Sequence, residues 1–173
     1  MSARTFAVVM AVLAVIGLLG FGLIDKNEEA ISVGDQTPEA ELTELDSGEP
    51  ASLDDYRGEW VLVNFWSSWC KPCRTESPDL QEFQDAHAGE LSVVGINLED
   101  ASDDAEAFVA EFGLTYPQLR AANNRELRED YGMVARPENF LIDPDGDVAL
   151  IQRGPVNAEI LRDRVEPLIS ERS

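Results

Sequence analysis

Three residue types on which many functions depend are scarce in this chain of 173 residues, which has two cysteines, one histidine and two lysines. Cys70 and Cys73 can form one disulfide or dithiol, but they cannot supply the four ligands of a structural zinc site, and His87 lies far along a predicted helix. We therefore expect no bound metal. Basic residues number 13 against 34 acidic residues, which gives a net charge of −21. Such a surface repels phosphate groups, so we expect no nucleic acid partner.

Charge is also absent from residues 6–24, an apolar run of 19 residues that is about as long as a membrane-spanning helix. Arg4 precedes the run and acidic residues follow it, so the rest of the chain is expected outside the cytoplasmic membrane. A cleaved signal peptide is the alternative, although its apolar core usually has roughly 7–15 residues and ends near an A-x-A site. We predict a membrane anchor (or signal peptide) over 1–26, a linker over 27–37 and one domain over 38–173.

Strand and helix patterns alternate through that domain. Continuous apolar runs predict buried strands, and apolar residues at helical spacing predict helices. The predicted strands cover 41–45, 60–66, 91–98, 118–120, 140–143 and 148–152, and the predicted helices cover 70–88, 101–112 (with Ser102 as its cap), 124–131 and 157–170. This order predicts an α/β fold whose sheet ends in an antiparallel hairpin.

The two cysteines lie at the junction between the predicted strand 60–66 and the helix that follows it. Unpaired N–H groups and a positive partial charge at a helix start stabilise a thiolate, which is the attacking species in disulfide exchange. Cys70 is therefore the predicted nucleophile, and Cys73, one helical turn later, is predicted to release the product. A disulfide over so short a loop adds little stability, which favours reversible redox chemistry with no cofactor besides this pair.

The segment Val63–Pro78, with the sequence VNFWSSWCKPCRTESP, resembles the active-site segment of extracytoplasmic thioredoxin-like proteins of the TlpA/ResA/CcmG (DsbE) group. The likeness covers about 33–169 and continues through Val93–Asn97, Tyr131–Met133, Pro137–Asp143 and Gly154. The resemblance implies a thioredoxin-like fold, a central mixed sheet flanked by helices, with an N-terminal β-hairpin extension and a membrane anchor. It also implies that the chain reduces apocytochrome c, or another extracytoplasmic disulfide protein, and is itself reduced by a membrane thiol carrier of the DsbD/CcdA type.

The resemblance also assigns roles to residues outside the C-x-x-C segment. Pro137 matches the family's cis-proline, whose loop packs beside the cysteine pair and binds an extended substrate segment. Asn64 stands where ordinary thioredoxins carry a buried Asp, and an amide cannot titrate. Glu76, three residues after Cys73, is therefore the expected group for proton handling and would raise the thiol pKa values by like-charge repulsion. A solvated surface carboxylate is the alternative interpretation of Glu76.

Three neighbours of these residues are expected to contact substrate. Trp69 is expected to lie partly exposed against the cysteine pair. Glu138 is expected either to shape a substrate groove or only to begin a strand. Arg136 departs from the family, which usually has a small or apolar residue before the cis-proline. A cation there would stabilise the Cys70 thiolate or pair with Glu138.

Other functions remain open from the sequence. A general disulfide oxidant or reductase would use the same two thiols in the same order. A thiol peroxidase would need a Ser or Thr three residues before its cysteine and a nearby Pro; Ser67 meets the first condition, but no Pro precedes it. A binding module would use the fold as a chaperone, or carry copper on Cys70 and Cys73.

Overall fold

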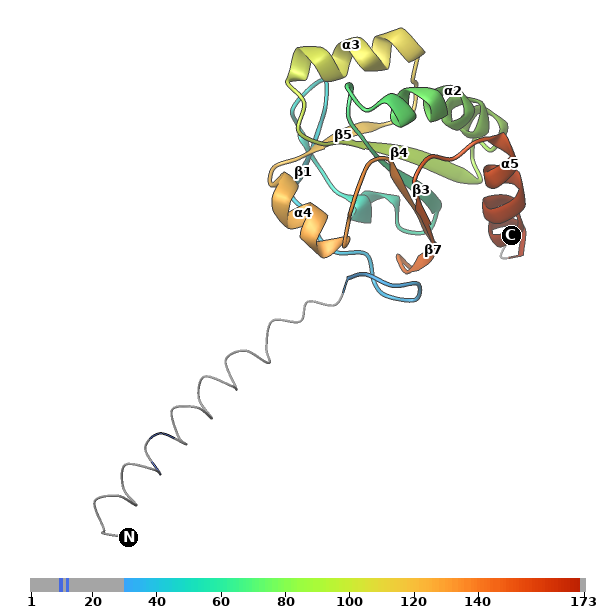
Figure 1. Cartoon of the computed structure of the whole chain (residues 1–173). Helices are drawn as coiled ribbons and strands as arrows, with labels where there is room; N and C mark the ends of the chain where they lie inside the picture. Colours follow the sequence, from blue (N-terminus) through green and yellow to red (C-terminus); the bar gives the residue numbers. More distant parts are fainter. Residues whose placement is uncertain (1–9, 11, 13–29, 172–173) are drawn as a thin grey trace.

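A seven-stranded mixed sheet forms the centre of the structure, a computed structural model that describes residues 10, 12 and 30–171 (Figure 1). Its strands are β1 (Leu42–Glu44), β2 (Pro50–Ala51), β3 (Trp60–Trp66), β4 (Leu91–Asn97), β5 (Gln118–Ala121), β6 (Glu138–Ile142) and β7 (Val148–Arg153). They lie in the order β2-β1-β5-β4-β3-β6-β7. The N-terminal hairpin β1–β2 extends one edge of the sheet, and the hairpin β6–β7 forms the other.

Strand β3 lies at the middle of the sheet and leads into the cysteine pair. It pairs in parallel with β4, from Trp60 opposite Leu91 to Trp66 opposite Asn97, and antiparallel with β6. Every residue of β3 is buried, because helices and loops cover both faces of the sheet. A strand buried on both faces reads as a continuous apolar run, which is why 60–66 was predictable from the sequence.

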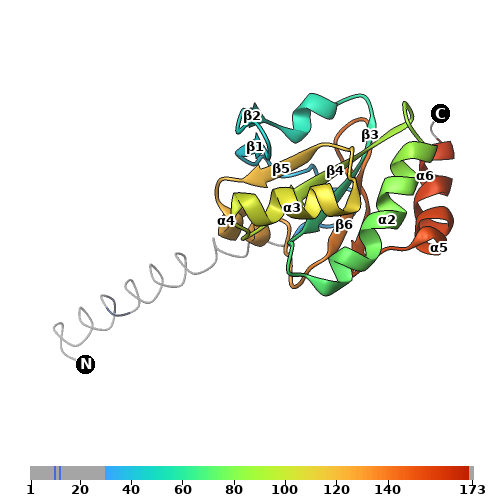
Figure 2. The ribbon, with the colours of Figure 1, turned by 90° about the horizontal axis from the view of Figure 1, so that it is seen from above.

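The helices lie on both faces of the sheet. They are η1 (Leu53–Tyr56), α2 (Lys71–Ala86), α3 (Ser102–Phe112), α4 (Asn124–Asp130), α5 (Ala158–Ile160), η2 (Leu161–Val165) and α6 (Glu166–Glu171). One core joins the sheet to α2, α3 and the C-terminal helical segments, and the other joins it to α4. Figure 2 shows α2, α3 and α6 lying across the same face.

Two details of the helices differ from the sequence-based expectation. Ser102 is not the cap of α3: the helix begins at Ser102 itself, its N-cap is Ala101, and no side chain caps it. The Ser102 hydroxyl instead accepts a hydrogen bond from Arg120 on β5. The predicted helix 157–170 is continuous but contains a π-helical turn, η2, and Asn157 caps it as expected, by accepting from the Ile160 N–H.

The N-terminal predictions meet the structure only in part. The predicted anchor, 1–26, falls almost wholly outside the described residues, and no helix in the part of the chain that the structure describes is long and apolar enough to cross a membrane. The predicted linker, 27–37, contacts the domain from Ile31 onward. Ile31 is buried in the sheet core, and the Gly34 N–H donates to the Val148 carbonyl at 2.8 Å.

Candidate active site

A disulfide between Cys70 and Cys73 lies at the start of α2, with the two Cα atoms 5.3 Å apart. Cys70 is the N-cap of the helix, and its sulfur accepts a hydrogen bond from the Cys73 N–H at 3.3 Å. Pro72 lies in the first turn, where no intrahelical N–H is needed. Cys70 is 4% exposed and Cys73 1% exposed. The predicted pair is thus brought together where a helix start favours a thiolate at Cys70.

Glu76 lies on α2, about one helical turn after Cys73, and is 1% exposed. Its carboxyl group accepts hydrogen bonds from Asn64 Nδ2 at 2.7 Å, the Val156 N–H at 2.9 Å and Asn139 Nδ2 at 3.3 Å. Burial raises the pKa of Glu76 to about 7, although these three donors pull it down. The alternative of a solvated surface carboxylate is wrong. A carboxyl group with this pKa can take up and release a proton near neutral pH.

Asn139 is a site residue that the sequence analysis missed. It lies on β6 directly opposite Asn64 on β3, and Asn64 Nδ2 donates to Asn139 Oδ1 at 2.9 Å. The two amides therefore hold Glu76 between two strands and one helix. The sequence carried a signal for Asn139: an amide within a buried apolar strand needs a polar partner, which indicates a polar contact inside the core.

The loop that faces the disulfide carries the cis peptide bond between Arg136 and Pro137, as the resemblance implied. Glu138 holds this loop from inside: it is 1% exposed, and one carboxylate oxygen accepts from the Val134 N–H at 2.9 Å and the Ala135 N–H at 3.2 Å. Its other oxygen pairs with Arg153 on β7. Glu138 therefore fixes the shape of the loop with a buried carboxylate.

Arg136 does not pair with Glu138, which corrects that expectation. Its Nη2 lies 2.9 Å from Glu99, and its guanidinium carbon lies 4.5 Å from the centre of the Trp69 ring. Trp69 is 62% exposed, so the expected exposure of its ring is confirmed, while its packing against the cysteine pair stays a prediction. Arg128 also binds Glu99, at 2.9 Å, and Arg136 in particular holds the pKa of Glu99 below its usual range. Glu99 thus offsets part of the positive charge beside Cys70.

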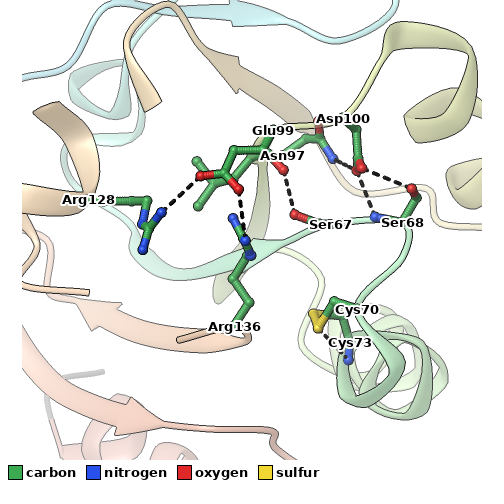
Figure 3. A network of polar contacts seen from close by, with 10 residues as sticks. Ser67, Ser68, Cys70, Cys73, Asn97, Glu99, Asp100, Arg128 and Arg136 are labelled. Atoms are coloured by element: carbon green, nitrogen blue, oxygen red, sulfur yellow. Dashed lines mark hydrogen bonds and ion pairs between the residues drawn. A yellow bond between two sulfur atoms is a disulfide. The ribbon is translucent and has the colours of Figure 1, made fainter. Parts of the chain in front are cut away.

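Glu99 and its neighbour Asp100 tie together the two loops that flank the disulfide (Figure 3). Glu99 binds Arg136 of the cis-proline loop. Asp100 accepts from the Ser68 N–H at 2.7 Å, the Ser68 hydroxyl at 2.9 Å and Asn97 Nδ2 at 2.6 Å. Sequence analysis missed both residues, although polar residues just after a buried parallel strand often lie at a functional edge.

Replacing Asp100 with Ala is expected to destabilise the chain by about 1–3 kcal/mol, because the half-buried Ser68 N–H and two further donors lose a charged acceptor. The free energy of unfolding in urea measures the loss. Glu82→Ala, on the exposed side of α2, is the control and should stay within about 0.5 kcal/mol of the natural chain. Equal effects of the two substitutions would show that Asp100 does not hold the loop.

Ser67, three residues before Cys70, is fully buried and donates its hydroxyl hydrogen bond to the Leu98 carbonyl. Its hydroxyl is therefore engaged with the residue that follows β4 and not with the cysteine, so the structure adds nothing in favour of a thiol peroxidase. Across residues 30–171, no cluster of three or more His, Cys, Asp or Glu side chains is placed to hold a metal ion.

Comparison with known proteins places this geometry in a family. The model of the AhpC/TSA family matches residues 33–151. The chain is 34% identical to the thiol:disulfide interchange protein HelX of Rhodobacter capsulatus, over 79% of this chain and 77% of HelX. It is 31% identical to the thiol-disulfide oxidoreductase ResA of Geobacillus kaustophilus, over 94% of this chain and 92% of ResA. Its fold is similar to the thioredoxin domain of a thiol-disulfide oxidoreductase from Bacteroides vulgatus, with a TM-score of 0.73 and 24% identity over 81% of this chain and 99% of that domain.

Proposed function

This chain belongs to the AhpC/TSA family and is a thioredoxin-like thiol–disulfide oxidoreductase of the TlpA/ResA/CcmG type, and from that premise we propose that it reduces the C-x-x-C-H disulfide of apocytochrome c. The single observation that supports a dedicated reductant is the buried Glu76, about one helical turn after Cys73. A carboxyl group there disfavours a stable thiolate at Cys73, and a dithiol with high pKa values gives up its electrons readily.

The proposed reaction moves two electrons from this chain to its client. The Cys70 thiolate attacks one sulfur of the client disulfide, so that a mixed disulfide forms and one client thiolate leaves. Cys73 then attacks the Cys70 sulfur, which releases the second client thiolate and closes the Cys70–Cys73 disulfide. The client gains two thiols, and this chain becomes the disulfide form that the structure describes.

Glu76 serves the second step in this proposal. Cys73 must lose its proton before it can attack, and it is 1% exposed, so bulk water reaches it poorly. The Glu76 carboxyl group, with a pKa of about 7, can accept that proton near neutral pH. Asn64 and Asn139 hold the carboxyl group in place but cannot titrate themselves.

The proposal places the reaction outside the cytoplasmic membrane, with residues 1–26 as anchor. The support is the uncharged run 6–24 with Arg4 before it. A membrane thiol carrier of the DsbD/CcdA type would return the disulfide to the dithiol. Fusion of the first 30 residues to alkaline phosphatase tests the location, because that reporter is active only when it is exported; an inactive, cytoplasmic fusion would contradict it.

The reductant function is tested with a peptide that carries an oxidised C-x-x-C-H motif. The reduced full chain is expected to convert it to the dithiol, with a reduction potential near or below that of thioredoxin, about −270 mV. Equilibration with glutathione or dithiothreitol buffers measures the potential. A chain that leaves the peptide oxidised would contradict the proposed client.

A general disulfide oxidant is the second candidate, and Arg136 favours it. Its guanidinium lies over Trp69, the residue before Cys70. A cation close to Cys70 stabilises its thiolate, and a stable thiolate makes the disulfide more oxidising. Glu99 offsets that charge, which is why we place the reductant first. A potential near about −120 mV would reverse the order of the two candidates.

A further inference from the structure

A hollow of about 690 Å³ lies between α4 and the chain that leads to the cis-proline loop. Met133 and Val134 give it an apolar side, and Arg125, Arg128, Glu99 and Glu129 give it a charged side. Val134 is 80% exposed, so its apolar side chain is available for contact. Glu99 links the hollow to the redox site, because it also binds Arg136, whose guanidinium lies over Trp69, the residue before Cys70.

The charge of this hollow differs from that of the rest of the molecule. The chain carries a net charge of −21, yet Arg128 and Arg136 meet here around one carboxylate, that of Glu99. Figure 3 shows the two guanidinium groups on either side of it. Arg125 and Glu129, which also line the hollow, lie 4.0 Å apart and cancel one another's charge. The two cations that share Glu99 therefore leave a local positive charge. Side chains within a few ångströms respond to that charge more than to the distant acidic surface, which salt screens over about 8 Å.

We infer that this hollow binds the segment of the client chain that flanks its disulfide, and that it selects segments carrying an acidic side chain. The client carboxylate binds Arg128 and takes over part of the position that Glu99 holds in the free protein. An apolar client residue packs on Met133 and Val134. The inference rests on the proposed exchange reaction and adds to it a preference for the sequence around the client cysteines.

Matched peptides test the preference. Each has the same C-x-x-C-H core and carries Asp, Asn or Lys in turn at successive positions on either side of it. The rate constant of exchange with the full chain is measured in both directions, from peptide disulfide to dithiol and back. At the position that reaches the hollow, the Asp peptide is expected to react about three- to tenfold faster than the Asn peptide, on the scale of partly buried ion pairs, and the Lys peptide more slowly.

Two variants should move this ratio in opposite directions, which a merely structural role for the residues would not do. Arg128→Gln removes the client's partner, so the Asp-to-Asn ratio should fall towards one. Glu99→Gln removes the internal competitor, so the ratio should rise. Arg162→Gln, an exposed arginine paired with Asp163 on the C-terminal helical segment, is the matched control and should leave the ratio unchanged.

A ratio of one or below at every position in the natural chain would overturn the inference, as would equal falls in all three variants. The result remains separable from the proposed function. If exchange runs only towards oxidation of the peptide, the reductant function fails, while the ratio of the Asp and Asn rates still reports on the hollow.

Discussion

A Cys73→Ser variant is expected to stop at the mixed disulfide and to accumulate covalently joined to its client. Cys70 can still attack, but no second thiol is present to release the product. Cys70→Ser is expected to lose exchange by about three orders of magnitude or more, because the residue that begins the reaction is gone. Both substitutions change one buried sulfur to oxygen, so each is the matched control for the other.

Non-reducing gel electrophoresis followed by mass spectrometry measures the covalent product. The Cys73→Ser chain should yield a species whose mass is the sum of chain and client, and dithiothreitol should separate the two by reducing the disulfide that joins them. The Cys70→Ser chain should yield none. The reverse pattern would mean that Cys73, in spite of its 1% exposure, is the attacking cysteine.

Glu76→Gln is expected to stabilise the disulfide form at pH 8 by about 1–3 kcal/mol and to leave its stability at pH 4 nearly unchanged. The pKa of Glu76 is about 7 in the folded chain, whereas its ordinary value is 4.5. Between these two values the folded chain binds the extra proton, so its stability falls as pH rises from about 4.5 to 7 and stays low above 7. An amide at this position carries no charge to bury at any pH.

Urea unfolding of the disulfide form at pH 4, 6 and 8 measures the difference. Glu82→Gln makes the same change at an exposed site on α2 and should have an effect below about 0.5 kcal/mol at each pH. If the difference between Glu76→Gln and the natural chain were the same at pH 4 and pH 8, Glu76 would not titrate in this range. The rate of exchange should also lose its inflection near pH 7 in this variant, since the proposed proton acceptor is absent.

The parts of the fold that the sequence predicted are those in which neighbouring residues decide the outcome. The buried strand Trp60–Trp66 has the predicted bounds, and the helix that carries the cysteines begins within one residue of its predicted start. Continuous apolar runs and a Pro in the first turn are local signals. The short helix Leu53–Tyr56 also had one, the capping box from Ser52 to Asp55, which the analysis overlooked.

The parts that were missed depend on contacts between distant segments. Pairing with Glu138, two residues away, was one of two expectations for Arg136, but the structure pairs it with Glu99, 37 residues earlier. Glu138 turns inward to two backbone N–H groups and Arg153 because the loop before it closes over its carboxylate. Charge spacing along a chain cannot decide such choices, because several oppositely charged partners lie within reach and only the sheet order brings one of them close.

The near-complete burial of Cys70 and Cys73 also limits the folding stage at which a client can react. Cys70 is 4% exposed and directly follows the exposed Trp69, so an incoming disulfide has little room to approach it. A disulfide inside a folded protein is held by its surroundings, whereas one in an unfolded chain can extend into a narrow approach. We therefore propose that the clients are chains that have not yet folded, and that the disulfides of folded neighbouring proteins are left intact.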